Sequence, residues 1–206
     1  RLTELAKVAK QIGVERFVLD DGWFGSRRDD TKGLGDWTVS DAVWPNGLQP
    51  LIDVVKENGM EFGLWFEGEM VNPDSDLYRE HPDWILSAGG RVPPTGRGQL
   101  VLDLTNPDCY QHIFGQVDQI LSDYEISYIK WDHNRPLVEP GSAGRAAAHA
   151  QTEAIYRMFR ELKQNHPGLE IESCASGGGR IDLGMAQIAS EEHTSELQSP
   201  CRISYA

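Results

Sequence analysis

Apolar residues along the chain alternate between a helical period and short continuous runs, which predicts helices that alternate with buried strands. Residues 2–12 have apolar side chains at helical spacing, and Gly13 follows as a stop signal. The side chains expected on the buried face of this helix are Leu2, Leu5, Ala6, Ala9 and Ile12. The next run, "RFVLDDG", is apolar and ends abruptly in carboxylates, which is typical of a buried strand.

The same order of helix and strand repeats three more times. Further helices are predicted at residues 47–59, 106–124 and 146–165, and further strands in "MEFGLWFEGE", "ISYIKWDHNR" and "LEIESCASGGGR". Asn106 is suited to cap the third helix, and Pro107 fits the first helical position. Strands separated by helices predict parallel βαβ units with right-handed crossovers.

Two α/β architectures contain such units, an open doubly wound sheet and a (β/α)8 barrel. The glycines of "SGGGR" are contiguous and precede no clear helical pattern, so they do not match the dinucleotide fingerprint. Polar side chains end each predicted strand, and in a barrel these ends meet on one catalytic face. These side chains are Asp20 and Asp21, Glu67 and Glu69, Lys130 and Asp132, and Glu172 and Cys174. The pattern therefore favours the barrel.

The chain is short for a complete barrel, which takes about 250 residues. Its 206 residues predict a partial (β/α)8 barrel with about four of the eight βα units. Residues 72–104 follow the second predicted strand and read as a long, elaborated loop on the catalytic face, and loops of that length in compact domains tend to be functional.

Composition and charge narrow the possible partners. The formal net charge is −13, which disfavours nucleic acid and anionic membranes, because both would repel the chain. Three scattered cysteines indicate neither a disulfide framework nor a zinc site. The first residues lack the apolar stretch of a signal peptide, and the few scattered cysteines fit a reducing location, so we expect a cytoplasmic protein. The chain begins with Arg1 instead of methionine, so we also expect its true N-terminus to be missing.

The strand "YIKWDHNR" carries the first candidate for chemistry. Lys130 and Asp132 are two residues apart and point to the same side of a strand, so the cation favours the ionised form of Asp132. An ionised, sheltered carboxylate suits a nucleophile or a charge stabiliser. The alternative is an ion pair that closes the end of a strand. Trp131 points to the opposite side and is expected in the core.

The motif "LDDGWF" supplies two successive carboxylates, Asp20 and Asp21, at another strand end. A carboxylate pair can accept hydrogen bonds from the vicinal hydroxyls of a sugar, and Trp23 or Trp65 can stack on its apolar face. A calcium site or a helix N-cap is the alternative. Carboxylates, tryptophans and amides outnumber histidines among the candidates, which favours glycoside chemistry, where two carboxyl groups flank the scissile bond.

Five motifs taken together resemble bacterial α-galactosidases of glycoside hydrolase family 36, the melibiase-like enzymes. They occur in the order "FVLDDGWF", "FGLWFEGEMV", "LYREHPDW", "YIKWDHNR" and "ESCASGGGRIDLGM". The resemblance implies a retaining enzyme that removes terminal α-linked galactose from oligosaccharides such as melibiose and raffinose. It also implies a (β/α)8 catalytic domain, no metal or organic cofactor, and homo-oligomers in the full-length enzyme.

The same resemblance implies a role for individual residues. Asp132 would be the nucleophile, and Asp20 and Asp21 would bind galactose hydroxyls. The remaining residues that would line or contact the galactose subsite are Trp65, Arg97, Lys130, Asn134, Cys174 and Gly177. Without the resemblance, Arg97 reads as a solvated loop charge and Cys174 as a small buried residue. Gly68 stands where the family commonly has proline, and we expect it to loosen its loop.

The end of the chain departs from the family. There the family continues into a strand with "WTSD", whose aspartate is the general acid and base, whereas residues 190–206 read "SEEHTSELQSPCRISYA". This tail resembles the translation of a sequencing-adapter oligonucleotide. We therefore expect residues 1–189 to be the central part of a glycosidase domain and residues 190–206 to be an artefact that is disordered or arbitrarily packed, with Glu196 taking no part in catalysis.

Together, these expectations describe a fragment of a catalytic domain that is inactive because its general acid/base residue is missing. Two alternatives stay open. One is a non-catalytic sugar-binding protein, and the other is an α-N-acetylgalactosaminidase or an α-galactosyl transferase on the same fold.

Overall fold

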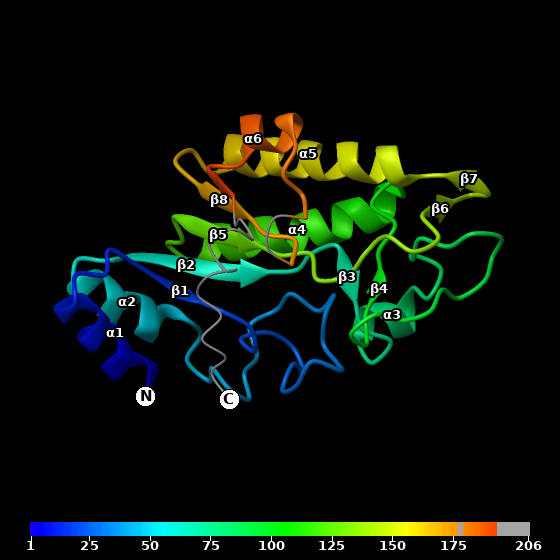
Figure 1. Cartoon of the computed structure of the whole chain (residues 1–206). Coiled ribbons are helices and arrows are strands. Elements are labelled where there is room, and N and C mark those ends of the chain that lie inside the picture. Colours follow the sequence, from blue (N-terminus) through cyan, green and yellow to red (C-terminus); the bar gives the residue numbers. More distant parts are fainter. Residues whose placement is uncertain (177–178, 193–206) are drawn as a thin grey trace.

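The computed structural model describes residues 1–176 and 179–192 and contains six helices and nine strands within them (Figure 1). The helices are α1 (Leu2–Gln11), α2 (Gln49–Glu57), α3 (Asp76–Glu80), α4 (Pro107–Asp123), α5 (Ala148–Asn165) and α6 (Leu183–Ile188). The strands are β1 (Arg16–Leu19), β2 (Glu61–Phe66), β3 (Met70–Val71), β4 (Leu100–Val101), β5 (Tyr128–Trp131), β6 (Gly141–Ser142), β7 (Arg145–Ala146), β8 (Glu170–Ser173) and β9 (Glu191–Glu192).

Five strands form one parallel sheet in the order β1-β2-β5-β8-β9. Each strand of this sheet lies beside the next one along the chain, and helices fall between the first four strands (Figure 1). Phe17 pairs with Phe62 and Leu64 with Ile129, so apolar residues of successive strands stand next to one another. The predicted alternation of helices with parallel strands is therefore confirmed.

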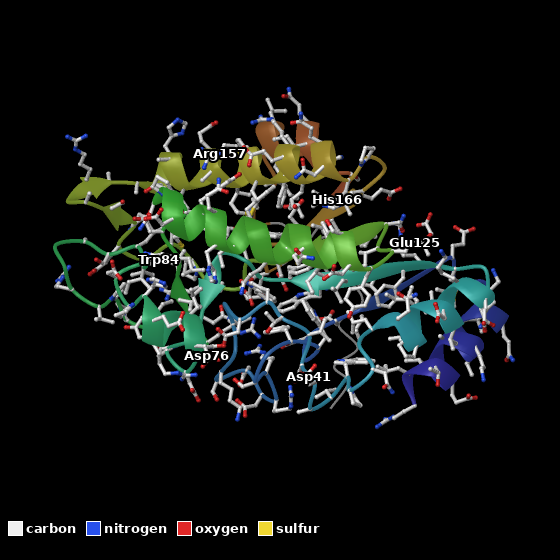
Figure 2. The ribbon with its side chains drawn as sticks, turned by 180° about the vertical axis from the view of Figure 1, so that it is seen from behind. Asp41, Asp76, Trp84, Glu125, Arg157 and His166 are labelled. Atoms are coloured by element: carbon white, nitrogen blue, oxygen red, sulfur yellow. The ribbon has the colours of Figure 1, made fainter. Side chains whose placement is uncertain are left out.

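A side-chain cap explains where the third predicted helix begins. Asn106 caps α4, because its side-chain oxygen accepts a 3.0 Å hydrogen bond from the Asp108 N–H, and Pro107 occupies the first helical position. Six side chains of α4 are buried, and α5 lies against it. Seen from behind (Figure 2), His166 ends α5, and its Nε2 lies 2.8 Å from Oδ1 of Asp118 on α4. The predicted cap is confirmed.

Helix α1 lies at the edge of the sheet, and its apolar face is only partly covered. Ala6 is fully buried, as predicted, whereas Leu5 is 54% and Ile12 is 78% exposed. Helix α1 packs against α2. The expectation that Leu5 and Ile12 are buried is therefore wrong for the described part of the chain.

Two long connections cover the carboxyl ends of the strands. Residues 20–48 join β1 to α2 and hold a cluster of buried rings, in which Trp23 packs edge-on against Phe66 with 5.3 Å between ring centroids. Residues 72–104 follow β2, as predicted, and their apolar run "LVLDL" includes β4, which pairs antiparallel with β3. Parts of both connections are thus buried against the sheet, whereas residues 89–92 of the second one are exposed.

Only the first three residues of the tail belong to the described part. The Ser190 N–H donates to the Ile171 carbonyl oxygen, and β9 pairs in parallel with β8. Residues 193–206, Glu196 among them, lie outside the described residues. Among the helices of the described part, none is long and apolar enough to cross a membrane.

Gly68 is packed tightly instead of loosening its loop. A Cβ atom at this position would lie 2.3 Å from the Trp131 ring, a distance that forces the ring or the backbone to move. Gly115 lies in α4, and a Cβ atom there would meet nothing within 4 Å. The two glycines therefore provide opposite tests of packing.

Replacing Gly68 with alanine is expected to destabilise the fold by about 1–3 kcal/mol, the usual cost of overpacking a core. Gly115→Ala is the matched control and should stabilise the fold by about 0.5–1 kcal/mol, because alanine favours the helix. Urea unfolding followed by circular dichroism measures both changes. Equal effects of the two substitutions would contradict the contact between Gly68 and Trp131.

Candidate active site

The predicted polar residues gather where β1, β2, β5 and β8 end. Parallel pairing places Trp65 beside Lys130 and Phe66 beside Trp131, so the residues that follow β2 and β5 emerge next to each other. The Asp132 N–H continues this ladder with a 2.8 Å hydrogen bond to the Phe66 carbonyl oxygen. The sheet thus brings Asp132 and Glu67 to one place, although they are far apart in the sequence.

Asp132 is the most enclosed of the site residues predicted to act chemically. Its side chain is 7% exposed, and its Oδ2 accepts a 3.2 Å hydrogen bond from Trp65 Nε1. Oδ1 accepts a 2.9 Å hydrogen bond from the His133 N–H. Both carboxylate oxygens therefore have a donor, and these two hydrogen bonds fix the orientation of the carboxylate.

Lys130 pairs with a different carboxylate from the one expected. Its Nζ lies 3.5 Å from Oδ2 of Asp20, and no ion pair joins it to Asp132 among the described residues. Burial lowers the pKa of Lys130, but the negative charges of Asp20 and Glu172 outweigh that effect and raise its pKa above the ordinary value. Lys130 thus stays charged, and Asp132 obtains its nearest donors from Trp65 and the backbone.

The two successive aspartates have different surroundings. Both lie beyond the end of β1, and the Asp21 N–H donates to Oδ1 of Asp20 at 2.8 Å. Asp21 is held by the buried Arg27, whose Nη2 and Nε lie 2.7 and 2.9 Å from its carboxylate oxygens. Asp20, whose side chain is 63% exposed, is the more accessible of the two. A bidentate arginine holds a carboxylate in a fixed orientation.

The tryptophans of the site are mostly buried. Trp23 is fully buried, and its Nε1 donates a 2.9 Å hydrogen bond to the Trp65 carbonyl oxygen. The expectation that Trp23 stacks on a sugar is therefore wrong, because its ring has no exposed face. Trp65 is 3% exposed and acts on the site through its hydrogen bond to Asp132.

The remaining predicted residues surround the same strand ends. Arg97 is exposed in a tight turn, with a backbone φ of 52°. The Asn134 N–H donates a 2.6 Å hydrogen bond to Oε1 of Glu67. Cys174 follows β8 and is buried. Gly177 lies outside the described residues, so its predicted role stays a prediction.

Glu67 is a functional candidate that the sequence did not single out beyond its place at a strand end. Its side chain is 1% exposed, and besides Asn134 it accepts a 3.1 Å hydrogen bond from Gln99 Nε2. Burial raises the pKa of Glu67 to about 7, and the negative charge of Asp132 adds to the rise. In the sequence, the one sign of a functional role for Glu67 was its position at the end of a buried strand. Its proximity to Asp132 arises only when β2 and β5 pair in the folded chain.

Glu69 lies on the other side of the sheet from Asp132. Trp131, which alternates with Lys130 and Asp132, donates from Nε1 to Oε1 of Glu69 at 3.2 Å and packs against Phe159 of α5. Arg180 pairs with Glu69 at 2.5 Å. Glu69 thus lies beyond the end of β2, as predicted, but it contacts Trp131 and not Asp132. A cavity of about 510 Å³ adjoins this pair and is lined mainly by α5, α6 and the loops that follow β5 and β8.

Metal coordination was an open alternative for the aspartate pair. In residues 1–176 and 179–192, no three histidine, cysteine, aspartate or glutamate side chains are grouped as a metal site requires. Asp20 and Asp21 instead face the cations of Lys130 and Arg27.

Comparison with known proteins gives concordant matches over most of the chain. A family model described as Melibiase matches residues 1–203. An α-galactosidase of Escherichia coli is 52% identical over 182 residues, which are 88% of this chain and 26% of the relative. The chain therefore spans about a quarter of the length of such relatives.

Solved structures agree with the sequence matches. The crystal structure of the GH36 α-galactosidase AgaA from Geobacillus stearothermophilus superposes with a TM-score of 0.89 at 42% identity, over 94% of this chain and 28% of AgaA. A variant of AgaA in complex with raffinose gives the same TM-score, identity and coverage. The open parallel sheet is thus similar to part of the fold of GH36 α-galactosidases.

The raised pKa of Glu67 predicts how stability depends on pH. The pKa is about 7 in the folded protein against 4.5 for an unperturbed carboxyl group, so the folded state binds this proton more tightly than the unfolded chain. The stabilisation is complete at low pH and is lost as the pH rises through 7. We expect Glu67→Gln, which cannot ionise, to gain up to about 3 kcal/mol relative to the wild type between about pH 4.5 and pH 8.

Urea unfolding of both proteins over this pH range gives the difference directly. Other titrating groups cancel in the comparison, because both proteins contain them. Two curves that stay parallel across the whole range would show that Glu67 does not titrate with a raised pKa.

Proposed function

Because the chain belongs to the melibiase family, we propose that it carries the nucleophile and most of the galactose subsite of a retaining α-galactosidase. The observation that supports this most strongly is the enclosed Asp132 carboxylate, which Trp65 Nε1 and the His133 N–H orient at the end of β5. A fixed, ionised carboxylate beside an accessible strand end is the arrangement that a double-displacement glycosidase needs.

In the proposed reaction, an oxygen of Asp132 attacks the anomeric carbon while the bond to the leaving group breaks. The transition state resembles an oxocarbenium ion, so the negative charge of Asp132 stabilises it before the covalent bond forms. The Trp65 and His133 N–H groups keep the carboxylate in place, and this lowers the cost of reaching the reactive geometry.

The surrounding polar groups would bind the sugar hydroxyls. Asp20 is exposed enough to accept hydrogen bonds, and its pairing with Lys130 puts a donor next to that acceptor. Arg27 holds the Asp21 carboxylate in one orientation, so Asp21 can accept a hydrogen bond from a sugar hydroxyl in one direction only. Arg97, Asn134, Cys174 and Gly177 complete the proposed subsite. Galactose-containing oligosaccharides are the proposed substrates, which the raffinose complex of a related AgaA variant supports.

Glu67 is not the missing general acid, although its pKa suits that role. It is 1% exposed, and its two oxygens already accept hydrogen bonds from Asn134 and Gln99, so no leaving-group oxygen can reach it. We propose that the acid/base belongs to a part of the full-length enzyme that is absent from this chain. The proposal also includes a barrel segment at residues 1–189, a foreign tail at residues 190–206, and a cytoplasmic, homo-oligomeric full-length protein.

A galactosyl donor that needs no acid provides the first test. With α-galactosyl fluoride, Asp132 forms a bond to the anomeric carbon, and fluoride leaves with the electron pair of the broken bond. Because no general base activates water afterwards, we expect a galactosyl ester to accumulate on the wild-type chain. Intact-protein mass spectrometry detects the added hexosyl unit, and peptide mapping locates it.

Asp132→Asn is the matched control and should not be labelled, because its amide is a poor nucleophile. Circular dichroism confirms that both proteins are folded. If the folded wild-type chain stays unlabelled, or if the label sits on another residue, the proposed role of Asp132 is wrong.

An ordinary substrate provides the second test. We expect an aryl α-galactoside to be hydrolysed slowly or not at all by the 206-residue chain, since loss of a general acid typically costs about 10²–10⁴-fold in rate. The release of the coloured phenol measures this turnover. Rapid hydrolysis that Asp132→Ala abolishes would show that the chain contains its own acid/base.

A further inference from the structure

Glu67 connects two segments that carry residues of the proposed galactose subsite. Its Oε1 accepts the Asn134 N–H from the segment after β5, and its Oε2 accepts Nε2 of Gln99 from the turn before β4. Asp132 precedes Asn134 by two residues, and Arg97 precedes Gln99 by two residues. One buried carboxyl group thus joins the nucleophile segment to the turn that carries Arg97.

Besides Glu67, the side chains of Asn72 and Arg135 hold the turn around Arg97, and Arg135 Nη1 donates to the Gln99 carbonyl oxygen at 2.5 Å. The Gly96 and Gln99 backbones bond to each other at 2.9 and 3.1 Å, and Arg97 itself has a left-handed φ of 52°. Asn72 Nδ2 donates to the Gly98 carbonyl oxygen at 2.9 Å. Glu67 therefore provides one of the side-chain contacts that tie this turn to the sheet.

Burial of a carboxyl group costs free energy, so the contacts of Glu67 must offset that cost. If Glu67 were removed, the partly buried Asn134 N–H would lose its acceptor, and leaving a donor without a partner costs free energy in proportion to its burial. In addition, Oε1 of Gln99 is buried and has no hydrogen-bond partner among the described residues. Rotation of the Gln99 amide by 180° would turn this oxygen toward Glu67, where a protonated carboxyl group could donate to it.

We propose that Glu67 is a positioning residue that holds the backbone beside Asp132 and the turn bearing Arg97 in the arrangement a galactosyl group requires, and that it keeps both contacts whether or not it is protonated. This inference rests on the proposed function of Asp132. Glu67 acts through Asn134 and Gln99 and does not touch the substrate.

The charge of Glu67 adds a second effect on the nucleophile. The charged groups that face it are Asp132, from the segment after β5, and Arg97, from the turn before β4. Ionised Glu67 repels the Asp132 carboxylate, and this repulsion disappears when Asp132 becomes a neutral ester. Ionisation of Glu67 should therefore accelerate the covalent step, because it raises the free energy of the ground state more than that of the transition state.

The rate of labelling by α-galactosyl fluoride as a function of pH tests the proposal. For the wild-type chain we expect the rate at Asp132 to rise about tenfold around pH 7, the factor that corresponds to one unit of pKa coupling. Glu67→Gln resembles the protonated form, so its rate should stay flat at the low-pH value. Glu61→Gln is the matched control at the exposed opposite end of β2 and should keep the wild-type profile.

The outcomes separate this inference from the proposed function. If the wild type is labelled at Asp132 and Glu67→Gln keeps the wild-type pH profile, the role of Glu67 is wrong and the proposed function stands. If the folded wild type is not labelled, the proposed function is wrong. Hydrogen exchange then decides the role of Glu67, since exchange at the Asn134 amide and at residues 96–99 must be faster in Glu67→Leu, whose side chain can make neither contact, than in the wild type.

A second variant covers the case in which Glu67→Gln does not fold. Gln99→Met preserves the volume of the side chain but removes the donor that favours the ionised form of Glu67. We expect the midpoint of the wild-type pH profile to move upward in this variant. If the wild type has no rise around pH 7, or if the midpoint does not move, the proposal is overturned.

Discussion

The register between β2 and β5 is the constraint on which the rest of the site depends. Trp65 pairs with Lys130, and Phe66 with Trp131, so Glu67 and Asp132 leave their strands together. A shift of one residue would turn every side chain of β5 to the opposite face. Asp132 would then point toward the helices, and Trp131 would occupy the place of the nucleophile. The hydrogen bond from Trp65 to Asp132 exists only in the observed register.

Successive side chains of β5 point to opposite sides, so the residues of the candidate site lie on one side and the residues that pack against the helices lie on the other. Lys130 and Asp132 face the polar strand ends, while Trp131 packs on Phe159 and binds Glu69 on the helix side. Arg180 then links Glu69 to the loop after β8. The ion pair is largely buried, and Glu69 Oε1 also accepts the hydrogen bond from Trp131. The loops around the candidate site are therefore anchored from behind the sheet, away from the surface that would meet a sugar.

Although the chain is acidic overall, basic side chains pair with acidic ones in the candidate site. Lys130 faces Asp20, and Arg27 holds Asp21, so the two successive aspartates have separate counterions. Asp132 instead depends on neutral N–H donors. Burial of Glu67 near Asp132 raises the pKa of Glu67 to about 7, although the positive charge of Arg97 acts in the opposite direction.

Local patterns in the sequence were sufficient for the order of helices and strands, the Asn106 cap and the polar strand ends, because each depends on neighbouring residues. The five motifs were also sufficient for the family. Tertiary structure alone decided that Trp23 is buried, that Lys130 pairs with Asp20, and that Glu67 faces Asp132 while Glu69 does not. These facts depend on which strands become neighbours and in which register, and pairing between distant segments leaves no periodic signal in the chain.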